Sequence, residues 1–172
     1  MKVLTQDDAA ELLKVDGLDS FVTERCDQLQ LVGGGYTVSS DTASKTALAK
    51  FLAHLLLKQP EVCVYVTGWG LRPTAEQLDL LYGYRRSVGE TRMLTEAPLH
   101  LFDQSGSDAL GSILCLVFYF ALEAWVFDVA GTTMIRISHD GRIETRSSGR
   151  GDLVDFAGEP EKYLKALGAR AA

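Results

Sequence analysis

The stretch that decides the fold is WVFDVAGTTMIRISHDGRIETRS, residues 125–147. Three runs in it, at 125–129, 133–138 and 142–147, are rich in β-branched and aromatic residues, and short turns separate them. This pattern predicts three strands that form a meander, in which each strand pairs antiparallel with the next.

Alternation of apolar and polar residues fixes the register of the second hairpin. A loop of three residues, 139–141, sets Ile137 opposite Ile143 and Arg136 opposite Glu144. One face then becomes apolar, and the other gains an ion pair between strands. Such a loop needs a left-handed residue at its last position, and a glycine stands there. We therefore interpret His139 and Asp140 as turn residues rather than as a catalytic pair.

A loop of three residues also predicts the register of the first hairpin. A loop over 130–132 sets Phe127 opposite Ile135 and Trp125 opposite Ile137. Both hairpins would then place their apolar residues on one face of the sheet. We expect helices to pack on that one face.

The rest of the chain supplies those helices and further strands. We predict helices at 6–14, 42–58, 74–88, 109–122 and 160–167, with Thr5, Asp41 and Thr74 as N-caps of the first three. Either Ser107 or Asp108 is expected to cap the helix at 109–122, whose apolar composition predicts the central buried helix. Short strands are expected at 61–67 and 98–103. Residues 21–38 are predicted to be extended or turning, with Gly33–Gly35 as a flexible break.

These elements predict an α+β fold with a largely antiparallel sheet that ends in a three-stranded meander. The 172 residues suit one domain, 1–172, and no linker divides them. With 47% hydrophobic residues, the chain is long and apolar enough to bury a core.

Charge and composition narrow the function classes. The net charge of −6 argues against nucleic-acid binding and is compatible with a basic protein partner. The three cysteines, Cys26, Cys63 and Cys115, have neither disulfide nor metal spacing, so we expect no metal or cofactor. Cys63 and Cys115 stand in apolar runs and are expected to be buried. No signal peptide and no membrane span is apparent, so a cytoplasmic location and no membrane partner are expected.

Catalytic motifs are missing from the sequence, and its acidic residues are the best candidates for chemistry. Asp103, Asp108, Glu123 and Asp128 flank the apolar helix and the strands beside it. They could supply a carboxylate pair for a small hydrolase, or His100 could act with one acid. The alternative is that they cap elements and lie in solvent, or together form an acidic patch at one edge.

Two residues in the loop after the strand at 61–67 are candidates for binding. Trp69 stands between two glycines, and Arg72 follows closely. Loops that a scaffold holds often carry function, and Trp and Arg are common hot-spot residues at interfaces. The alternative is a tryptophan that covers the edge of the core.

Between residues 99 and 145, the segments DALGSILCLVFYFALEAWVFD and ISHDGRIE resemble small bacterial immunity proteins that are encoded beside polymorphic toxins. The resemblance lies in an apolar helix, an aromatic strand with Asp, and a hairpin with an SHD-like turn. It implies a non-enzymatic, one-domain inhibitor that occludes a toxin active site, often with acidic groups. It carries no functional residues over to this chain.

The leading hypothesis is therefore a cytoplasmic bacterial protein-binding domain, and an immunity-type inhibitor of a toxin domain is its most specific form. Its expected contact residues are Trp69, Arg72, Asp103, Asp108, Glu123, Asp128 and His139. A small hydrolase is the second hypothesis. A structural subunit is the third, in which the strand at 142–147 presents its edge to a copy of itself in a homo-oligomer.

Overall fold

The computed structural model describes residues 1–69 and 74–149. Its helices are α1 (Gln6–Leu13), α2 (Leu18–Gln28), α3 (Thr42–Leu56), α4 (Ala75–Ser87) and α5 (Ser107–Tyr119). Its strands are β1 (Lys2–Leu4), β2 (Gln30–Thr37), β3 (Glu61–Trp69), β4 (Leu99–Asp103), β5 (Leu122–Asp128), β6 (Thr133–Ile137) and β7 (Arg142–Ser147). None of the helices in these ranges is long and apolar enough to cross a membrane. The helix predicted at 160–167 lies outside the described residues.

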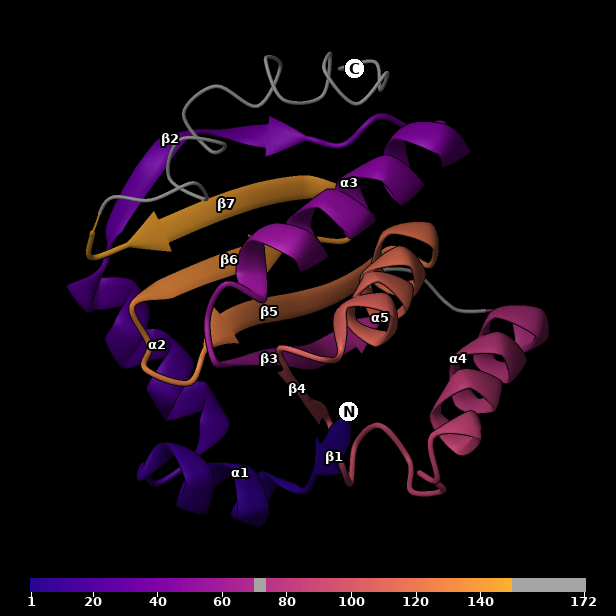
Figure 1. The fold of residues 1–172 in the computed structure, drawn as a ribbon, viewed down its shortest axis with the longest axis horizontal. Coiled ribbons are helices and arrows are strands. Elements are labelled where there is room, and N and C mark those ends of the chain that lie inside the picture. The colour runs from indigo at the N-terminus through magenta and orange to yellow at the C-terminus, as the bar shows by residue number, and fades with distance from the viewer. Residues whose placement is uncertain (70–73, 150–172) are drawn as a thin grey trace.

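The strands form one seven-stranded sheet in the order β1-β4-β3-β5-β6-β7-β2 (Figure 1). Every neighbouring pair is antiparallel. The α+β class, the antiparallel sheet and the meander β5-β6-β7 are therefore confirmed.

Helices cover both faces of this sheet. α3 and α5 pack on one face, where Leu52 and Leu114 join the larger core (Figure 1). α1 and α2 cover the other face through Ala9 and Phe21, and the Phe21 ring lies 5.1 Å from the ring of Phe127 in β5. The expectation that helices pack on one face is thus met by α3 and α5 only, because α1 and α2 bury the second face.

The predicted register of the second hairpin is confirmed. Ile137 lies opposite Ile143, and Arg136 lies opposite Glu144. Gly141 closes the turn with φ +78°, the left-handed conformation that glycine adopts without strain.

The predicted register of the first hairpin is wrong by one residue. Phe127 lies opposite Met134, and Trp125 lies opposite Arg136, whose guanidinium is 5.9 Å from the indole centroid. A shift of one residue moves each side chain to the other face of the sheet. Phe127 and Met134 therefore face α2, and Ile135 faces α3 and α5.

Asp128 is the physical reason for this register. Its carboxylate accepts the backbone N–H groups of Thr132 at 2.9 Å and Thr133 at 2.7 Å, and the hydroxyl of Thr132 at 2.8 Å. These bonds stabilise a loop over 129–132, one residue longer than the loop predicted over 130–132. The side chain of Asp128 is buried in this turn.

Residues 21–38 hold the other difference from expectation. Residues up to Gln28 continue α2, and Gln30–Thr37 form β2, so Gly33–Gly35 lie within a strand rather than in a flexible break. The pairing with β7 shifts between Val32 and Tyr36, which accommodates the glycines in a bulge. Because β2 pairs with β7, the strand at 142–147 lies inside the sheet and offers no edge to a second copy.

Three of the predicted helix caps are confirmed. Thr5, Asp41 and Thr74 each accept a backbone N–H from the first turn of α1, α3 and α4, respectively. The cap of α5 differs, because Gly106 occupies the N-cap position, and Asp108 lies in the first turn instead. A carboxylate there still interacts favourably with the helix dipole.

Candidate functional site at the hairpin end of the sheet

The structure divides the predicted contact residues between two ends of the sheet. At one end, the backbone of Trp69 pairs with Leu122 and that of Gly68 with Glu123, next to the β6–β7 turn that carries His139. Asp103 and Asp128 lie at the other end, paired with Glu61 and Val62. Trp69 thus belongs to the end of β3 rather than to a loop. Arg72 lies outside the described residues.

The four acidic candidates form neither one patch nor a catalytic pair. Glu123 and Asp128 stand near opposite ends of β5, and Asp128 is occupied by its own turn. The Asp103 carboxylate accepts from the backbone and hydroxyl of Ser105, and these bonds lower the pKa of Asp103. Asp108 lies in the first turn of α5. The alternative that these acids lie in solvent at the ends of elements holds for Asp103 and Asp108, whereas Asp128 is buried.

His100 is buried within β4 and has no exposed surface. Its Nε2 lies 2.9 Å from a guanidinium nitrogen of Arg85, and its Nδ1 lies 3.3 Å from the carbonyl oxygen of Val64. An Arg nitrogen only donates, so Nε2 accepts and the proton is on Nδ1. Burial, and secondarily the charge of Arg85, lower the pKa of His100 to about 4. A neutral histidine closed off from solvent is poorly placed to act on a substrate with an acid.

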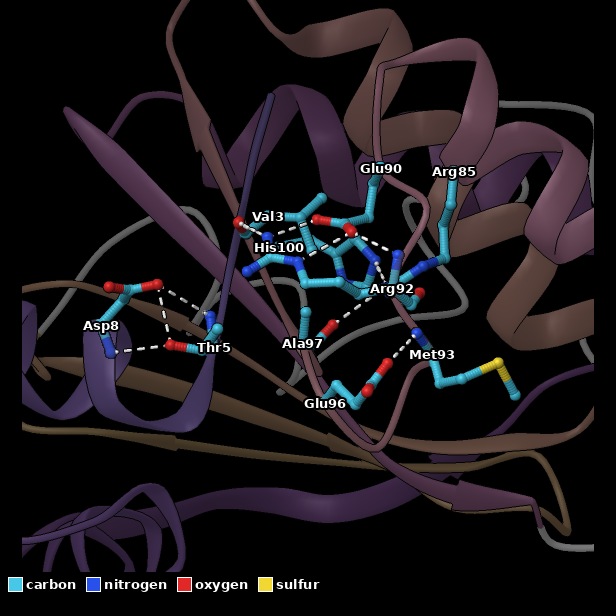
Figure 2. A network of polar contacts seen from close by, with 10 residues as sticks. All are labelled: Val3, Thr5, Asp8, Arg85, Glu90, Arg92, Met93, Glu96, Ala97 and His100. Atoms are coloured by element: carbon cyan, nitrogen blue, oxygen red, sulfur yellow. Dashed lines mark hydrogen bonds and ion pairs between the residues drawn. The ribbon is translucent and has the colours of Figure 1, made fainter.

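The same arginine anchors a network that sequence reasoning missed (Figure 2). The side chain of Arg85 is fully buried in α4 and donates to the carbonyls of Arg92 at 3.1 Å and Ala97 at 3.0 Å. Arg92 in turn donates to the carboxylate of Glu90 at 2.6 Å and to the carbonyl of Val3 in β1 at 3.0 Å. The guanidinium of Arg92 lowers the pKa of Glu90 to about 2. This network fixes the segment between α4 and β4 and is structural.

One signal in the sequence pointed to the network. Arg85 lies on the same helical stripe as Leu78, Leu81 and Tyr82, which places a cation on the buried face of α4. A buried arginine needs several acceptors, and backbone carbonyls after the helix are the nearest supply. Which carbonyls they would be depends on the path of the chain after Gly89, and composition does not determine that path.

Polar side chains gather at the hairpin end of the sheet. We call this set the hairpin surface, and it comprises Glu123, Arg136, Ser138, His139, Asp140, Arg142 and Glu144 around a hollow of about 200 Å³. The residues come from the start of β5, from β6, from the β6–β7 turn and from β7. Carboxylates and cations alternate over this surface, so it can pair with charges of both signs.

Within the hairpin surface, the contact between His139 and Glu123 joins the β6–β7 turn to β5. His139 Nδ1 lies 2.9 Å from Glu123 Oε1, and the side chains are 46% and 40% exposed. A carboxylate only accepts, so Nδ1 donates and Nε2 remains on the outer side of the ring. In the neutral form, Nε2 can accept a hydrogen bond from a bound group.

Other bonds hold the hairpin surface in shape. The Ser138 hydroxyl donates to the Asp140 carboxylate, which also accepts the N–H of Arg142 and has a lowered pKa for these reasons. Glu144 interacts with Arg142 at 3.5 Å and with Arg136 at 3.9 Å. Because the turn is fixed by its own backbone and side chains, a partner would meet a preformed surface.

A second hollow of about 190 Å³ lies on the other side of the turn. Its lining includes Val38, Lys45, Val117 and Phe118, together with His139 and Asp140. The turn thus contributes to two small hollows, one charged and one of mixed polar and apolar lining. Each is small enough to hold one side chain of a partner.

The described residues contain no group of three or more His, Cys, Asp or Glu that could hold a metal ion.

Cys63 is buried, as expected, and burial raises the pKa of its thiol to about 12. Cys115, which was also expected to be buried, is only partly buried, as is Cys26, and burial raises the pKa of each thiol. The chain matches no protein-family model, no curated protein and no solved structure.

Proposed function

We propose that this protein is a protein-binding domain that acts as an immunity-type inhibitor of a bacterial toxin, with the hairpin surface as its contact area. The single observation that supports this most is the contact of Glu123 with His139. Both are expected contact residues, Glu123 from β5 and His139 from the β6–β7 turn, and they meet in an exposed pair.

The chemistry of the hairpin surface favours recognition over turnover. Its polar groups are partly exposed and paired with one another, whereas a catalytic acid or base usually stands in a cleft where burial shifts its pKa. Arg142 and Arg136 can each donate to a partner carboxylate, and Glu123 can accept from a partner cation. Such a pattern of both signs gives specificity, since a wrong partner places like charges together.

The overall charge supports a basic partner. A net charge of −6 attracts a positively charged domain over distances of about 10 Å at moderate salt. The hairpin surface then aligns the partner through its alternating charges. We expect the rate of association to fall as salt is added, while the rate of dissociation changes less.

The test uses the product of the gene that neighbours the one for this chain. The two proteins are coexpressed, and both growth rescue and binding in a purified mixture are measured. His139→Ala should weaken binding at least about tenfold, the loss typical of a hot-spot residue. His54→Ala is the matched control, because His54 is an exposed histidine in α3 outside the hairpin surface.

Three results decide the proposal. Rescue and binding by the wild type that His139→Ala weakens and His54→Ala preserves would support it. Binding that both variants preserve would place the contact elsewhere on the molecule. A neighbouring product that neither binds nor is neutralised by the wild-type protein would refute the immunity-type function.

A further inference from the structure

A groove of about 830 Å³ lies between α3, α4 and α5, away from the hairpin surface. Its lining residues are Lys50 from α3, then Asp79, Leu80, Gly83 and Tyr84 from α4, and Ser107, Asp108, Gly111, Ser112, Cys115 and Leu116 from α5. In Figure 1, α4 stands beside α5 at the margin of the layer that α3 and α5 form.

The groove is elongated along α5. Its lining positions on that helix recur at intervals of three and four residues from Asp108 to Leu116, which is one stripe of a helix. Eight steps of 1.5 Å give this stripe a length of about 12 Å. The groove therefore follows the helix axis for about two turns.

Leucines from α4 and α5 give the groove an apolar floor. Leu80 on α4 is 60% exposed, and Leu116 on α5 is partly buried. A Cβ added at Gly83 would meet no atom within 4 Å, so the α4 wall is open at this position. The hydroxyl of Tyr84 donates to the carbonyl of Ala109 at 2.8 Å, which joins α4 to α5 beneath the groove.

Charge complementarity identifies the occupant. Asp79 on the α4 wall and Asp108 on the α5 wall are both exposed, and Lys50 on α3 is the cation among the lining residues. An apolar floor between two acidic walls fits an apolar stripe with basic residues on its flanks. A second copy of this chain that docked groove to groove would bring the same carboxylates together, which is unfavourable.

We propose that this groove binds an amphipathic helix of a partner protein, with apolar anchors at helical spacing and Lys or Arg beside them. The docked helix lies along α5, and its anchors contact Leu80, Gly83 and Leu116. Its basic residues approach Asp79 and Asp108. The site is distinct from the hairpin surface and does not depend on the function proposed for that surface.

The probe is a set of synthetic 14-residue helical peptides with Leu, Ile or Phe along one stripe and Lys on both flanks. Matched peptides carry Glu in place of Lys. Binding to the full chain is measured by fluorescence anisotropy at low salt. The best Lys peptide should bind at least about tenfold more tightly than its Glu counterpart, and added salt should reduce the difference.

Two variants locate the peptide. Gly83→Phe places a ring in the groove and should abolish binding, whereas Gly149→Phe, at an exposed glycine outside the groove whose added Cβ also meets no atom, should not. Asp79→Asn with Asp108→Asn should weaken the Lys peptide about threefold to tenfold and leave the Glu peptide no weaker. Asp16→Asn with Asp27→Asn removes the same charge from exposed sites outside the groove and should change little.

The outcomes are separable. Equal binding of Lys and Glu peptides, no binding of any Lys peptide, or binding that Gly83→Phe leaves intact would each overturn the proposal. Dodecyltrimethylammonium serves as a small-molecule probe. If it binds in the groove while the peptides do not, the site takes a small apolar cation instead. Variants at His139 should leave peptide binding unchanged, so the groove and the hairpin surface are tested independently.

Discussion

His100 shows what full burial does to a titrating side chain. Its ring is enclosed between the guanidinium of Arg85 and the carbonyl of Val64, so it stays neutral in the folded protein. Protonation would place a second cation 2.9 Å from the Arg85 nitrogen with no solvent to screen it. The histidine therefore contributes to the pH dependence of folding rather than to a reaction.

We predict that the free energy of unfolding rises with pH between about 4 and 6.5 because of His100. Its folded pKa, about 4, is below the ordinary value of 6.5, so in this window the unfolded chain binds more protons than the folded chain. Stability from this group is complete above pH 6.5 and is lost as the pH falls toward 4. Between pH 7 and pH 5 the loss should be about 2 kcal/mol.

Urea unfolding of the wild type and of His100→Gln at pH 7 and pH 5 measures this effect. The variant is expected to be less stable at pH 7 but to depend less on pH within the window. Equal pH dependence in the two proteins would show that His100 is not the group responsible.

Among the elements, the two hairpins of the meander show how far patterning predicts a structure. The β6–β7 turn was predictable because Gly141 and the alternation of Ile137 with Arg136 agree on one register. The β5–β6 register was missed because both faces of the sheet are buried. With Phe127 and Met134 in a second core, apolar alternation no longer distinguishes one face from the other.

The helix and strand at 18–37 were missed for related reasons. α2 begins at Leu18 after Gly17, which provides no side-chain cap, and its apolar stripe is short. The glycines of β2 have low strand propensity, so the pairing with β7 rather than the local sequence determines their conformation. In the candidate site, Glu123 and His139 were identified as residues, but their contact depends on β5 beginning at Leu122 and on its register with β6, and the sequence predicted neither.

Two glycine substitutions should have opposite effects on their elements. Gly141→Ala forces a Cβ into the left-handed conformation at φ +78° and should destabilise the protein by about 1 kcal/mol. Gly83→Ala lies within α4 with open space around its Cβ and should stabilise by about 0.5–1 kcal/mol. Chemical denaturation of both variants under one condition provides the measurement. Destabilisation by Gly83→Ala would mean that the α4 wall is less open than described.

Across the whole molecule, the Arg85 network connects one margin of the sheet to the rest. Arg85 holds the segment between α4 and β4, and Arg92 extends the connection to Val3 in β1 (Figure 2). By contrast, β5, β6 and β7 pair with one another and receive nothing from this network. The molecule therefore has a margin that depends on polar contacts and a centre that depends on apolar packing.

Arg85→Met should weaken that margin selectively. Methionine fills most of the volume but leaves the carbonyls of Arg92 and Ala97 without their donor, at a cost of about 3 kcal/mol. Hydrogen exchange should quicken in β1 and α4 more than in β5 and β6. Arg86→Met, at the exposed neighbouring position, is the control and should leave both rates unchanged. Uniform quickening in all strands would indicate that the margin does not open separately.

The strand order has a consequence for folding during synthesis of the chain. Both outer strands, β1 and β2, come from the first 37 residues, and their sheet partners are β4 at Leu99–Asp103 and β7 at Arg142–Ser147. During synthesis, β2 cannot pair with β7 until the chain between Thr37 and Ser147 has been translated. This takes on the order of ten seconds. The nascent chain thus emerges with both edge strands first, and its sheet can be completed only after β7 has been translated.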